Sequence, residues 1–352
     1  MKIIYDNDAS SDDVTALIYL ASHPDVTLEA VTIAGTGEAH GPDGARNIAD
    51  LCYMLGKPNT PIACGNEKPC DASGKPFPDV LRNLMDNLFK DKDVPKHPNP
   101  PINDSAVELI KTVLESSSEK VTILATGPLT NIAQFIEQYP YLKDNIEKIV
   151  IMGGAVNVHG NIKALDPTSD NIVAEWNIYA DPKAADIVFS SKIPVTLVPL
   201  DATNQVPMTK AFYDSLSHQL HAGLKLIYQL LKVIVDNYGM ELFLKEFYLW
   251  DPLAAMICVD PQLAITKTMA IAMDLKNAQT KPVAENSHGA SLIQVAVEIP
   301  QAHLILGQLI SEIKSNLIHA QSKTTPTNLF QIPPEVKMDS FQQAHSFEKR
   351  LS

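Results

Sequence analysis

The sequence predicts an α/β protein with an open, mostly parallel β-sheet that is covered by helices on both faces. Short apolar segments alternate with helical segments through the first two hundred residues. These apolar segments are nearly continuous, which is typical of parallel strands that are buried on both faces. Several of them end in glycine or in polar residues, and ligands of such sheets bind beyond the carboxyl ends of the strands.

The expected elements follow one another in regular order. We expect strands at residues 2–5, 28–35, 61–65, 121–127, 148–154 and 194–200, and helices at 14–20, 45–55 and 104–115. Residues 209–258 have mostly helical periodicity with a break at Gly239, and 264–274 and 291–299 resemble late strands. The length of 352 residues allows one large domain, which we place at 1–320, and a polar, loosely ordered tail at 321–352. The proline-rich segment 69–103 is long for a connection and is expected to close over the site.

Composition restricts the possible partners. A formal net charge of −13 argues against nucleic acid, because phosphate binding needs a basic surface. Neither an apolar run of membrane-spanning length nor a signal peptide is apparent, so no membrane partner is expected. The four cysteines form no Cys-x-x-Cys pair and suit a reducing compartment. These features predict an acidic, soluble, cytoplasmic protein.

The most informative motif is the octapeptide DNDASSDD at residues 6–13. Ser10 and Ser11 are favourable N-cap residues for the helix that follows, and Asp12 and Asp13 suit its first turn. Four carboxylates so close together repel one another unless a cation neutralises them. Oxygen ligands of this kind favour a hard ion such as Ca²⁺ or Mg²⁺.

Other interpretations of these motifs can be tested on the same residues. An EF-hand loop that starts at Asp6 would need glycine at its sixth position and glutamate at its twelfth, but Ser11 and Leu17 stand there. A phosphatase with an aspartyl nucleophile also begins with Asp-x-Asp and stays open on this segment alone. The glycines in 35–40 are a poor dinucleotide signal, because His40 occupies the third glycine position.

Five motifs in order give the chain a family resemblance. They are DNDASSDD (6–13), ATGPLTN (125–131), MGGA (152–155), AEWNIYADP (174–182) and WDPLA (250–254), with PLDAT (199–203) as a weaker sixth. Together they resemble the inosine-uridine type nucleoside hydrolases, which are calcium-dependent N-ribohydrolases with a Rossmann-like core. A phosphatase predicts none of the later motifs, so that interpretation is set aside.

The resemblance implies a role for each matching residue. Asp8, Asp13, Asp251 and the Thr126 carbonyl would bind Ca²⁺, and Asp8 would also be the general base for the attacking water. The nucleoside would be held by a larger set: Asp12, Glu38, Met152, Asn161, Glu175, Asn177 and Trp250. A site that hydrogen-bonds the ribose hydroxyls should discriminate against 2′-deoxynucleosides. The resemblance also implies a homodimer or homotetramer that acts in nucleoside salvage.

The chain departs from the family pattern at several positions. The family commonly has Asp-Pro-Gly where this chain has Asp8-Ala9-Ser10. The asparagine that usually contacts ribose is replaced by Thr36 or, with a small offset, by Glu38, which we favour. Asn161 is the least secure of the sugar contacts, because the loop at 160–173 looks longer than usual.

Trp250 is the departure that bears on the base. It replaces the histidine that many members use to protonate the leaving base, and tryptophan can stack on a base but cannot serve as that acid. This matches the purine-preferring branch, which encloses the base between aromatic rings. Leu81 stands where that branch has the second tryptophan, and Phe77 is the candidate substitute.

Four further residues receive structural interpretations. His40 and His159 are expected to be solvated loop residues, and Asp201 to brace the end of its strand. Trp176 should point into the core if 174–180 is a strand, since its neighbours would then face the site.

The sequence therefore predicts a calcium-dependent, purine-preferring nucleoside N-ribohydrolase. One alternative is a hydrolase for a modified or non-standard ribonucleoside. An alternative of another class is a non-catalytic, calcium-dependent protein that binds ribonucleosides or sugars, although pure binding would not require the presumed base Asp8.

Overall fold

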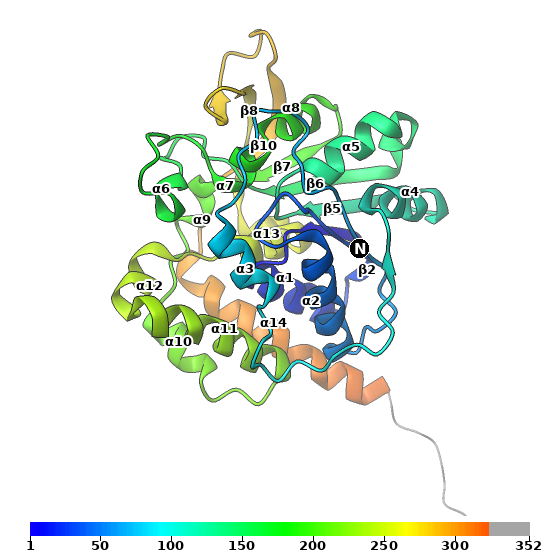
Figure 1. Ribbon diagram of the computed structural model, residues 1–352, viewed down its shortest axis with the longest axis vertical. Coiled ribbons are helices and arrows are strands. Elements are labelled where there is room, and N and C mark those ends of the chain that lie inside the picture. Colours follow the sequence, from blue (N-terminus) through cyan, green and yellow to red (C-terminus); the bar gives the residue numbers. More distant parts are fainter. Residues whose placement is uncertain (324–352) are drawn as a thin grey trace, which may run out of the picture.

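A ten-stranded sheet runs through the centre of the computed structural model, which describes residues 1–323 (Figure 1). The strand order is β4-β3-β2-β1-β5-β6-β7-β10-β8-β9, so β1 is internal and pairs with both β2 and β5. The strands are β1 (Lys2–Asn7), β2 (Thr27–Ile33), β3 (Ile62–Cys64), β4 (Ile102–Asn103), β5 (Val121–Ala125), β6 (Ile146–Met152), β7 (Val195–Val198), β8 (Ile265–Asp274), β9 (Gln279–Pro282) and β10 (Ser291–Glu298).

The sheet is open and mostly parallel, as predicted. Every neighbouring pair from β4 across to β10 is parallel, whereas β8 runs antiparallel to β10 and β9 antiparallel to β8. In β1 the side chains of Ile3, Ile4 and Tyr5 are fully buried, although they alternate between the two faces. The continuous apolar pattern of this strand therefore has the expected cause, which is cover on both faces of the sheet.

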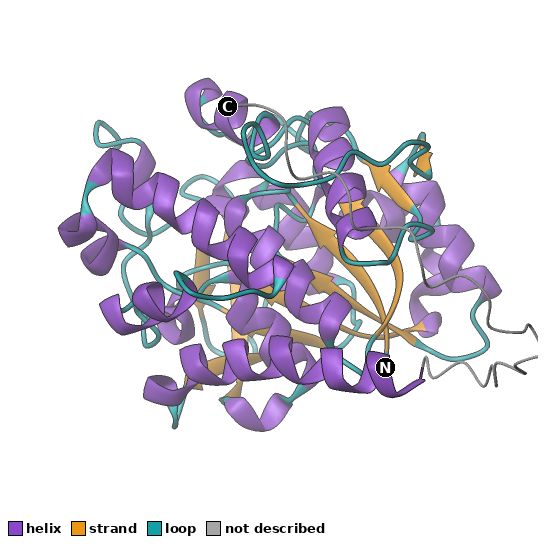
Figure 2. Ribbon diagram, turned by 90° about the horizontal axis from the view of Figure 1, so that it is seen from below, coloured by secondary structure: helices purple, strands orange, loops and turns teal. Residues whose placement is uncertain are grey.

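Helices cover both faces of the sheet (Figure 2). One face packs in an apolar core against α1 (Ser11–Ser22), α2 (Gly41–Met54), α11 (Ala222–Tyr238), α13 (Asp251–Val259) and α14 (Ala302–Lys323). The other face packs against α4 (Ala106–Ser116), α5 (Thr130–Gln138) and α8 (Pro182–Ser190). The shorter helices are α3 (Asp79–Asp86), α6 (Ile162–Leu165), α7 (Trp176–Ala180), α9 (Leu200–Thr203), α10 (Lys210–Leu216), α12 (Met240–Glu246) and the 3₁₀ turns η1 (Pro140–Asn145) and η2 (Pro261–Leu263).

The helical region after β7 has the expected interruption. Gly239 adopts φ of 85°, a left-handed conformation that glycine enters without steric cost, and it separates α11 from α12. Segment 69–103, expected as a long loop, contains α3 and the short edge strand β4. Helix α14 continues through residue 323, and the rest of the predicted tail, residues 324–352, lies outside the described part of the chain.

Two compositional expectations can be compared with the fold. Cys52, Cys64, Cys70 and Cys258 are all free thiols. Within residues 1–323, no helix combines the length and apolar character that crossing a membrane would require.

Candidate functional site

The predicted site residues converge at the carboxyl edge of the sheet. Asp8 follows β1, Glu38 follows β2, Thr126 follows β5 and Met152 ends β6. These four strands are consecutive in the sheet, in the order β2-β1-β5-β6, so their carboxyl ends meet along one edge. Asp251 reaches the same place from the first residue of α13, which packs directly against α1.

Asp13 is the most highly connected of the carboxylates. Its Oδ1 accepts hydrogen bonds from the hydroxyls of Tyr5, at 2.9 Å, and Thr126, at 2.5 Å. Its Oδ2 accepts from the backbone N–H groups of Asp8 and Ser10, at 3.1 and 3.0 Å. The Ser10 hydroxyl in turn caps the Asp13 N–H, so Ser10 is the N-cap of α1 as predicted and Asp13 completes a capping box. Tyr5, a buried residue inside β1 whose hydroxyl contacts Asp13, was not predicted from the sequence as part of the site.

Asp8 is enclosed by two glycines. A Cβ atom on Gly37 would lie 2.2 Å from Asp8 Cβ, and one on Gly127 would lie 2.9 Å from the same atom. The Glu38 N–H donates to Asp8 Oδ2 at 3.1 Å. Any side chain at these two positions would displace Asp8, so the glycines after β2 and β5 are a signal for its position that the sequence analysis did not use.

Ala9 explains the departure from Asp-Pro-Gly. It adopts φ of 60°, and its N–H donates to Asn7 Oδ1 at 3.0 Å. Proline fits neither feature, because its φ is fixed near −65° and it has no N–H. The turn therefore differs from the family pattern while Asp8 and Asp13 keep their spacing.

Five acidic side chains lie close enough to repel one another, and we call Asp8, Asp12, Asp13, Glu38 and Asp251 the carboxylate cluster. Burial raises the pKa of Asp8, and the charge of Asp13 raises it further. Burial, followed by the neighbouring acids, likewise raises the pKa values of Asp12, Glu38 and Asp251. The ion pairs formed in the described part of the chain involve none of these five carboxylates.

Asp6 does not join the carboxylate cluster, although it belongs to the same octapeptide. Its Oδ1 accepts hydrogen bonds from Thr32 Oγ1, at 2.5 Å, and Asn131 Nδ2, at 2.8 Å. Burial raises its pKa to about 7. The four acids of the motif are thus split, and Glu38 and Asp251 enter the cluster from other parts of the chain.

The chemistry of the carboxylate cluster fits a hard cation. Its donors are oxygen atoms only, and their mutual repulsion is not relieved by any ion pair with a basic side chain of residues 1–323. No three His, Cys, Asp or Glu side chains of that region stand as a ready-made set of metal ligands. Asp13 illustrates why, because both of its oxygens are turned toward hydrogen-bond donors.

The Asn177 side chain connects the ends of β5 and β6. Asn177 Nδ2 donates to the carbonyl oxygen of Thr126 at 2.8 Å and more weakly to that of Met152 at 3.3 Å. A carbonyl oxygen has two lone pairs, so the Thr126 carbonyl keeps one acceptor position beside this bond.

Glu175 and Asn161 both support the start of α7. The carboxylate of Glu175 accepts from the N–H groups of Gly154 and Asn177, each at 2.9 Å, and from Ile178 at 3.2 Å. Asn161 Oδ1 accepts from the Trp176 N–H at 3.1 Å. Glu175 lies near the carboxylate cluster, since its charge contributes to the raised pKa of Glu38. The contacts of Asn161 are instead with the backbone around the start of α7 and with its own loop.

Thr36 and Glu38 occupy different surroundings. Thr36 Oγ1 is 2.8 Å from Thr130 Oγ1, and Thr130 donates to Asp181. Glu38 instead lies among the acids of the cluster. Of the two candidates for the ribose contact, Glu38 is the one that faces the other predicted site residues.

Trp250 stands at the N-cap of α13 in an aromatic wall, which we define as Phe247, Tyr248 and Trp250. Its ring centroid is 5.9 Å from that of Phe247 and 6.0 Å from that of Tyr248. A cavity of about 40 Å³ adjoins this wall, and Asp12 and Trp250 are both among its lining residues. The remaining lining is mostly apolar and comes from α1, α10, α11, α13 and the segments before α10 and α13.

Phe77 does not face this cavity. It is 2% exposed and stacks on Trp176, with ring centroids 4.8 Å apart. Trp176 points into a small apolar cluster as predicted, but the reason given was wrong, because 176–180 is helix α7 and not a strand. Phe77, the candidate for the second aromatic ring, therefore packs against Trp176 and not beside Trp250.

The remaining histidine and aspartate expectations have mixed outcomes. His159 is exposed, as expected. His40 is not a solvated bystander: its backbone N–H and its ring Nδ1 both contact the carboxylate of Asp86, at 2.8 and 2.7 Å. Asp201, in α9 directly after β7, accepts from the N–H groups of Val156 and Asn157, so its carboxylate braces the loop after β6 and not, as predicted, the end of its own strand.

Known proteins resemble this chain in both sequence and structure. The pyrimidine-specific ribonucleoside hydrolase RihA of Klebsiella pneumoniae is 37% identical over 218 residues, which cover 60% of this chain and 64% of that protein, or less than two thirds of its length. The purine-preferring ribonucleoside hydrolase of Gardnerella vaginalis is 27% identical with a TM-score of 0.75, over 90% of this chain and 99% of that one. A plant nucleoside hydrolase, 24% identical with a TM-score of 0.77 over 89% and 99% of the two chains, shows the shared fold.

The model of one protein family matches residues 3–316, and its description is "Inosine-uridine preferring nucleoside hydrolase". That range contains α1, α13 and every residue of the carboxylate cluster. The chain therefore belongs to the family of inosine-uridine preferring nucleoside hydrolases.

Proposed function

We propose that this protein hydrolyses the N-glycosidic bond of ribonucleosides and releases a free base and ribose. The observation that carries the proposal is the position of Asp8, which is held between Gly37 and Gly127 beside the other acids of the cluster. A buried carboxylate with a raised pKa is a stronger base than a solvated one. Family membership and the named relatives point to the same reaction.

The proposed reaction is a displacement by water at C1′ of the ribose. The water oxygen forms a bond to C1′, its proton passes to Asp8, and the bond between C1′ and the base nitrogen breaks. The base leaves with that electron pair and takes a proton from solvent. The carboxylate cluster stabilises the positive charge that develops on the sugar.

We propose that Asp8, Asp13, Asp251 and the Thr126 carbonyl hold Ca²⁺. A bound Ca²⁺ would neutralise these oxygens and orient water and the ribose hydroxyls. The support is the oxygen-only donor set and the absence of ion pairs to the cluster from residues 1–323.

The sugar contacts are proposed for residues around the cluster. Asp12 and Glu38 are half-buried acids that can accept hydrogen bonds from ribose hydroxyls. Glu175, Asn177 and Asn161 lie on or next to the start of α7, and Met152 packs nearby against Asn177. Loss of the 2′ hydroxyl should then leave buried polar groups unpaired and disfavour deoxynucleosides.

For the base we propose a purine preference. Trp250 offers a flat surface next to Asp12 and the small apolar cavity, and stacking area is larger for purines. The names of the relatives do not decide between purine and pyrimidine bases, since one relative is called pyrimidine-specific and another purine-preferring. Because Phe77 is stacked on Trp176, we expect the preference to be moderate.

The test is an assay of released reducing sugar. The purified chain is incubated with inosine, guanosine, adenosine, uridine, cytidine and 2′-deoxyinosine, with and without chelator, and then with added Ca²⁺. We expect turnover of the ribonucleosides, purines before pyrimidines, and restoration of chelator-treated activity by Ca²⁺. A protein that binds inosine but releases no ribose would be a binding protein, and turnover that is unchanged by chelator would contradict the proposed metal.

Gel filtration in the same buffers tests the expected homodimer or homotetramer, and fractionation of the source cells tests the cytoplasmic location.

A further inference from the structure

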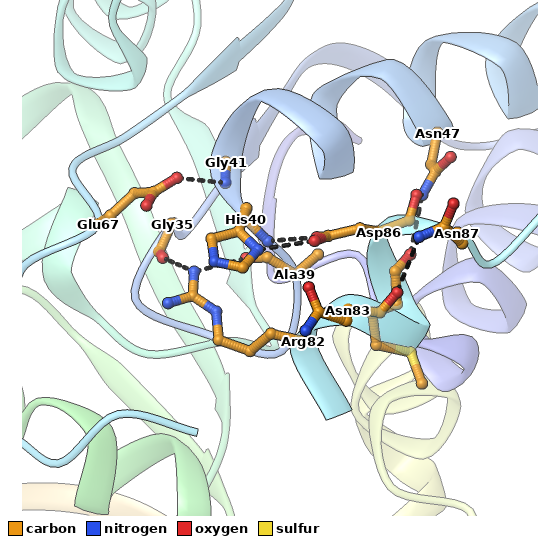
Figure 3. Close-up of polar contacts among 11 residues, drawn as sticks. Gly35, Ala39, His40, Gly41, Asn47, Glu67, Arg82, Asn83, Asp86 and Asn87 are labelled. Atoms are coloured by element: carbon orange, nitrogen blue, oxygen red, sulfur yellow. Dashed lines mark hydrogen bonds and ion pairs between the residues drawn. The ribbon is translucent and has the colours of Figure 1, made fainter. Parts of the chain in front are cut away.

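Helix α3 contacts the turn that follows β2, and this turn carries Gly37 and Glu38. Figure 3 shows Arg82 and Asp86 of α3 directed at the residues on either side of this turn. Neither residue belongs to the six motifs of the family resemblance, although Arg82 ends the segment 76–82 in which Leu81 stands at the position of the second tryptophan. Segment 69–103 therefore reaches the site through specific side chains and is not only a connection.

Arg82 holds the two ends of the turn together. Its Nη2 donates to the carbonyl oxygens of Gly35, at 2.7 Å, and Ala39, at 3.2 Å (Figure 3). The side chain is 7% exposed, and no carboxylate of residues 1–323 forms an ion pair with it. Its Nε has no hydrogen-bond partner in that part of the chain. A buried, incompletely partnered cation is costly for stability, so its presence points to a role beyond holding the fold.

Asp86 and Asn47 complete the attachment. Asp86 contacts both the backbone N–H and the ring of His40, the residue that follows the turn. Asn47 of α2 donates to the carbonyl oxygens of Met85 and Asp86 at the end of α3, at 3.0 and 3.2 Å (Figure 3). Helix α3 is thus attached to both the turn and the helix that the turn leads into.

The other side of the same turn faces the presumed general base. The Glu38 N–H donates to Asp8 Oδ2, and the Ala39 N–H donates to the Asp8 carbonyl, both at 3.1 Å. Gly37 is so close to Asp8 that no side chain fits between them. A movement of this turn by a fraction of an ångström would therefore move Asp8 and Glu38 together.

We propose that Arg82 is a positioning residue: by bridging the carbonyls of Gly35 and Ala39, it sets the places of Glu38 and Asp8 in the site. This role rests on the proposed function, in which Asp8 is the base and Glu38 contacts ribose. An arginine suits it because the two N–H groups of Nη2 are fixed in the guanidinium plane, whereas the ammonium group of a lysine rotates on a flexible stem.

The experiment compares Arg82→Met and Arg82→Lys with the control Lys90→Met, which removes an exposed cation from the same segment. We measure kcat and KM for the best ribonucleoside, alone and combined with Glu38→Gln. Misplaced reacting groups reduce rates steeply, so we expect Arg82→Met to lower kcat/KM on the order of tenfold to a hundredfold. Arg82→Lys should fall between it and wild type, and Lys90→Met should match wild type. If Arg82 acts through Glu38, the fold-loss of kcat/KM in the double variant Arg82→Met with Glu38→Gln is smaller than the product of the two single fold-losses.

Hydrogen exchange gives a second readout that does not depend on activity. The N–H groups of Glu38 and Ala39 should exchange faster in Arg82→Met, while amides in β5 and β6 should keep their protection. Uniformly faster exchange, multiplicative losses with Glu38→Gln, or a lowered melting temperature with unchanged kcat/KM would each assign Arg82 to the fold alone. A wild-type protein without turnover would contradict the proposed function, and the exchange pattern would still decide the position of the turn.

A second variant covers the case in which Arg82→Met does not fold. Asp86→Asn leaves Arg82 intact and weakens the contact with His40 at the other end of the turn. We expect the same local increase in exchange at Glu38 and Ala39 and a smaller loss in kcat/KM. Wild-type exchange at both amides in this variant would overturn the role proposed for the contacts of α3.

Discussion

Around Asp13 both side-chain oxygens have hydrogen-bond partners, whereas Trp250 is held by ring contacts beside an apolar cavity. Asp13 accepts from three hydroxyls and two backbone N–H groups that belong to β1, the turn between β1 and α1, and the loop after β5. In the aromatic wall, Trp250 contacts the rings of Phe247 and Tyr248, and apolar side chains of neighbouring helices line the cavity beside it. The carboxylate cluster and the aromatic wall therefore face the same site with different kinds of support.

This difference indicates how each region responds to substitution. Hydrogen bonds at the carboxylate cluster require particular atoms at particular distances, so a single replacement leaves buried partners unsatisfied. Apolar packing tolerates changes of similar volume. We infer that the aromatic wall can change its base preference while the carboxylate cluster keeps its chemistry, which accords with relatives named for purines and for pyrimidines.

The largest effect is expected from Asp13→Ala. The substitution removes the carboxylate that accepts from the Tyr5 and Thr126 hydroxyls, and it leaves the N–H groups of Asp8 and Ser10 without this acceptor. Removing a buried charged acceptor of this kind should lower the free energy of unfolding by about 3 kcal/mol. Differential scanning calorimetry with and without Ca²⁺ measures both consequences: a lower melting temperature and a lost response to the ion. A wild-type protein whose melting temperature ignores Ca²⁺ would contradict the metal assignment.

Asp8→Asn should remove catalysis while sparing the fold. The amide keeps the shape of the side chain but cannot accept the proton of water, so kcat should fall by about a hundredfold or more. The matched control is Asp43→Asn, an exposed aspartate in the first turn of α2, which should leave kcat unchanged. A near wild-type kcat for Asp8→Asn would exclude this residue as the base.

Trp250→Ala tests the aromatic wall. One stacking interaction is worth about 1 kcal/mol, or about fivefold in kcat/KM, and the loss should be larger for inosine than for uridine. Steady-state kinetics with inosine, guanosine, uridine and cytidine provide the comparison. Equal losses for all four would make Trp250 a structural residue and would leave the purine preference without support.

Phe247→Leu should have the smallest effect. It removes one aromatic contact with Trp250, worth about 0.5–1.5 kcal/mol, and keeps an apolar side chain of similar reach. We expect a melting temperature lower by about 1–3 °C and a slight shift in the ratio of kcat/KM for inosine and uridine. A loss of turnover as large as that of Asp8→Asn would show that the two regions are not independent.

The local parts of the site could be predicted from the sequence. The strand, turn and helix around residues 2–22 formed as expected, with Ser10 as N-cap, because β pattern, capping and the helix dipole act over a few neighbouring residues. The order of strands and glycine-ended loops also indicated one edge of the sheet as the site. Asp8, Thr126 and Met152 meet there because carboxyl ends of parallel strands must share an edge.

Tertiary packing alone decided which acidic and aromatic side chains lie in the candidate site and which lie in the surrounding core. Asp6 turns to Thr32 and Asn131, while Asp251 arrives on α13 to join the carboxylate cluster. Phe77 is buried against Trp176 and does not line the cavity beside Trp250, and Arg82 of α3 contacts the turn beside Asp8. The sequence by itself determined the fold class, the β1–α1 motif and the family. These contacts join residues far apart in the chain, and their geometry depends on how helices pack on the sheet, which local propensity and periodicity do not encode.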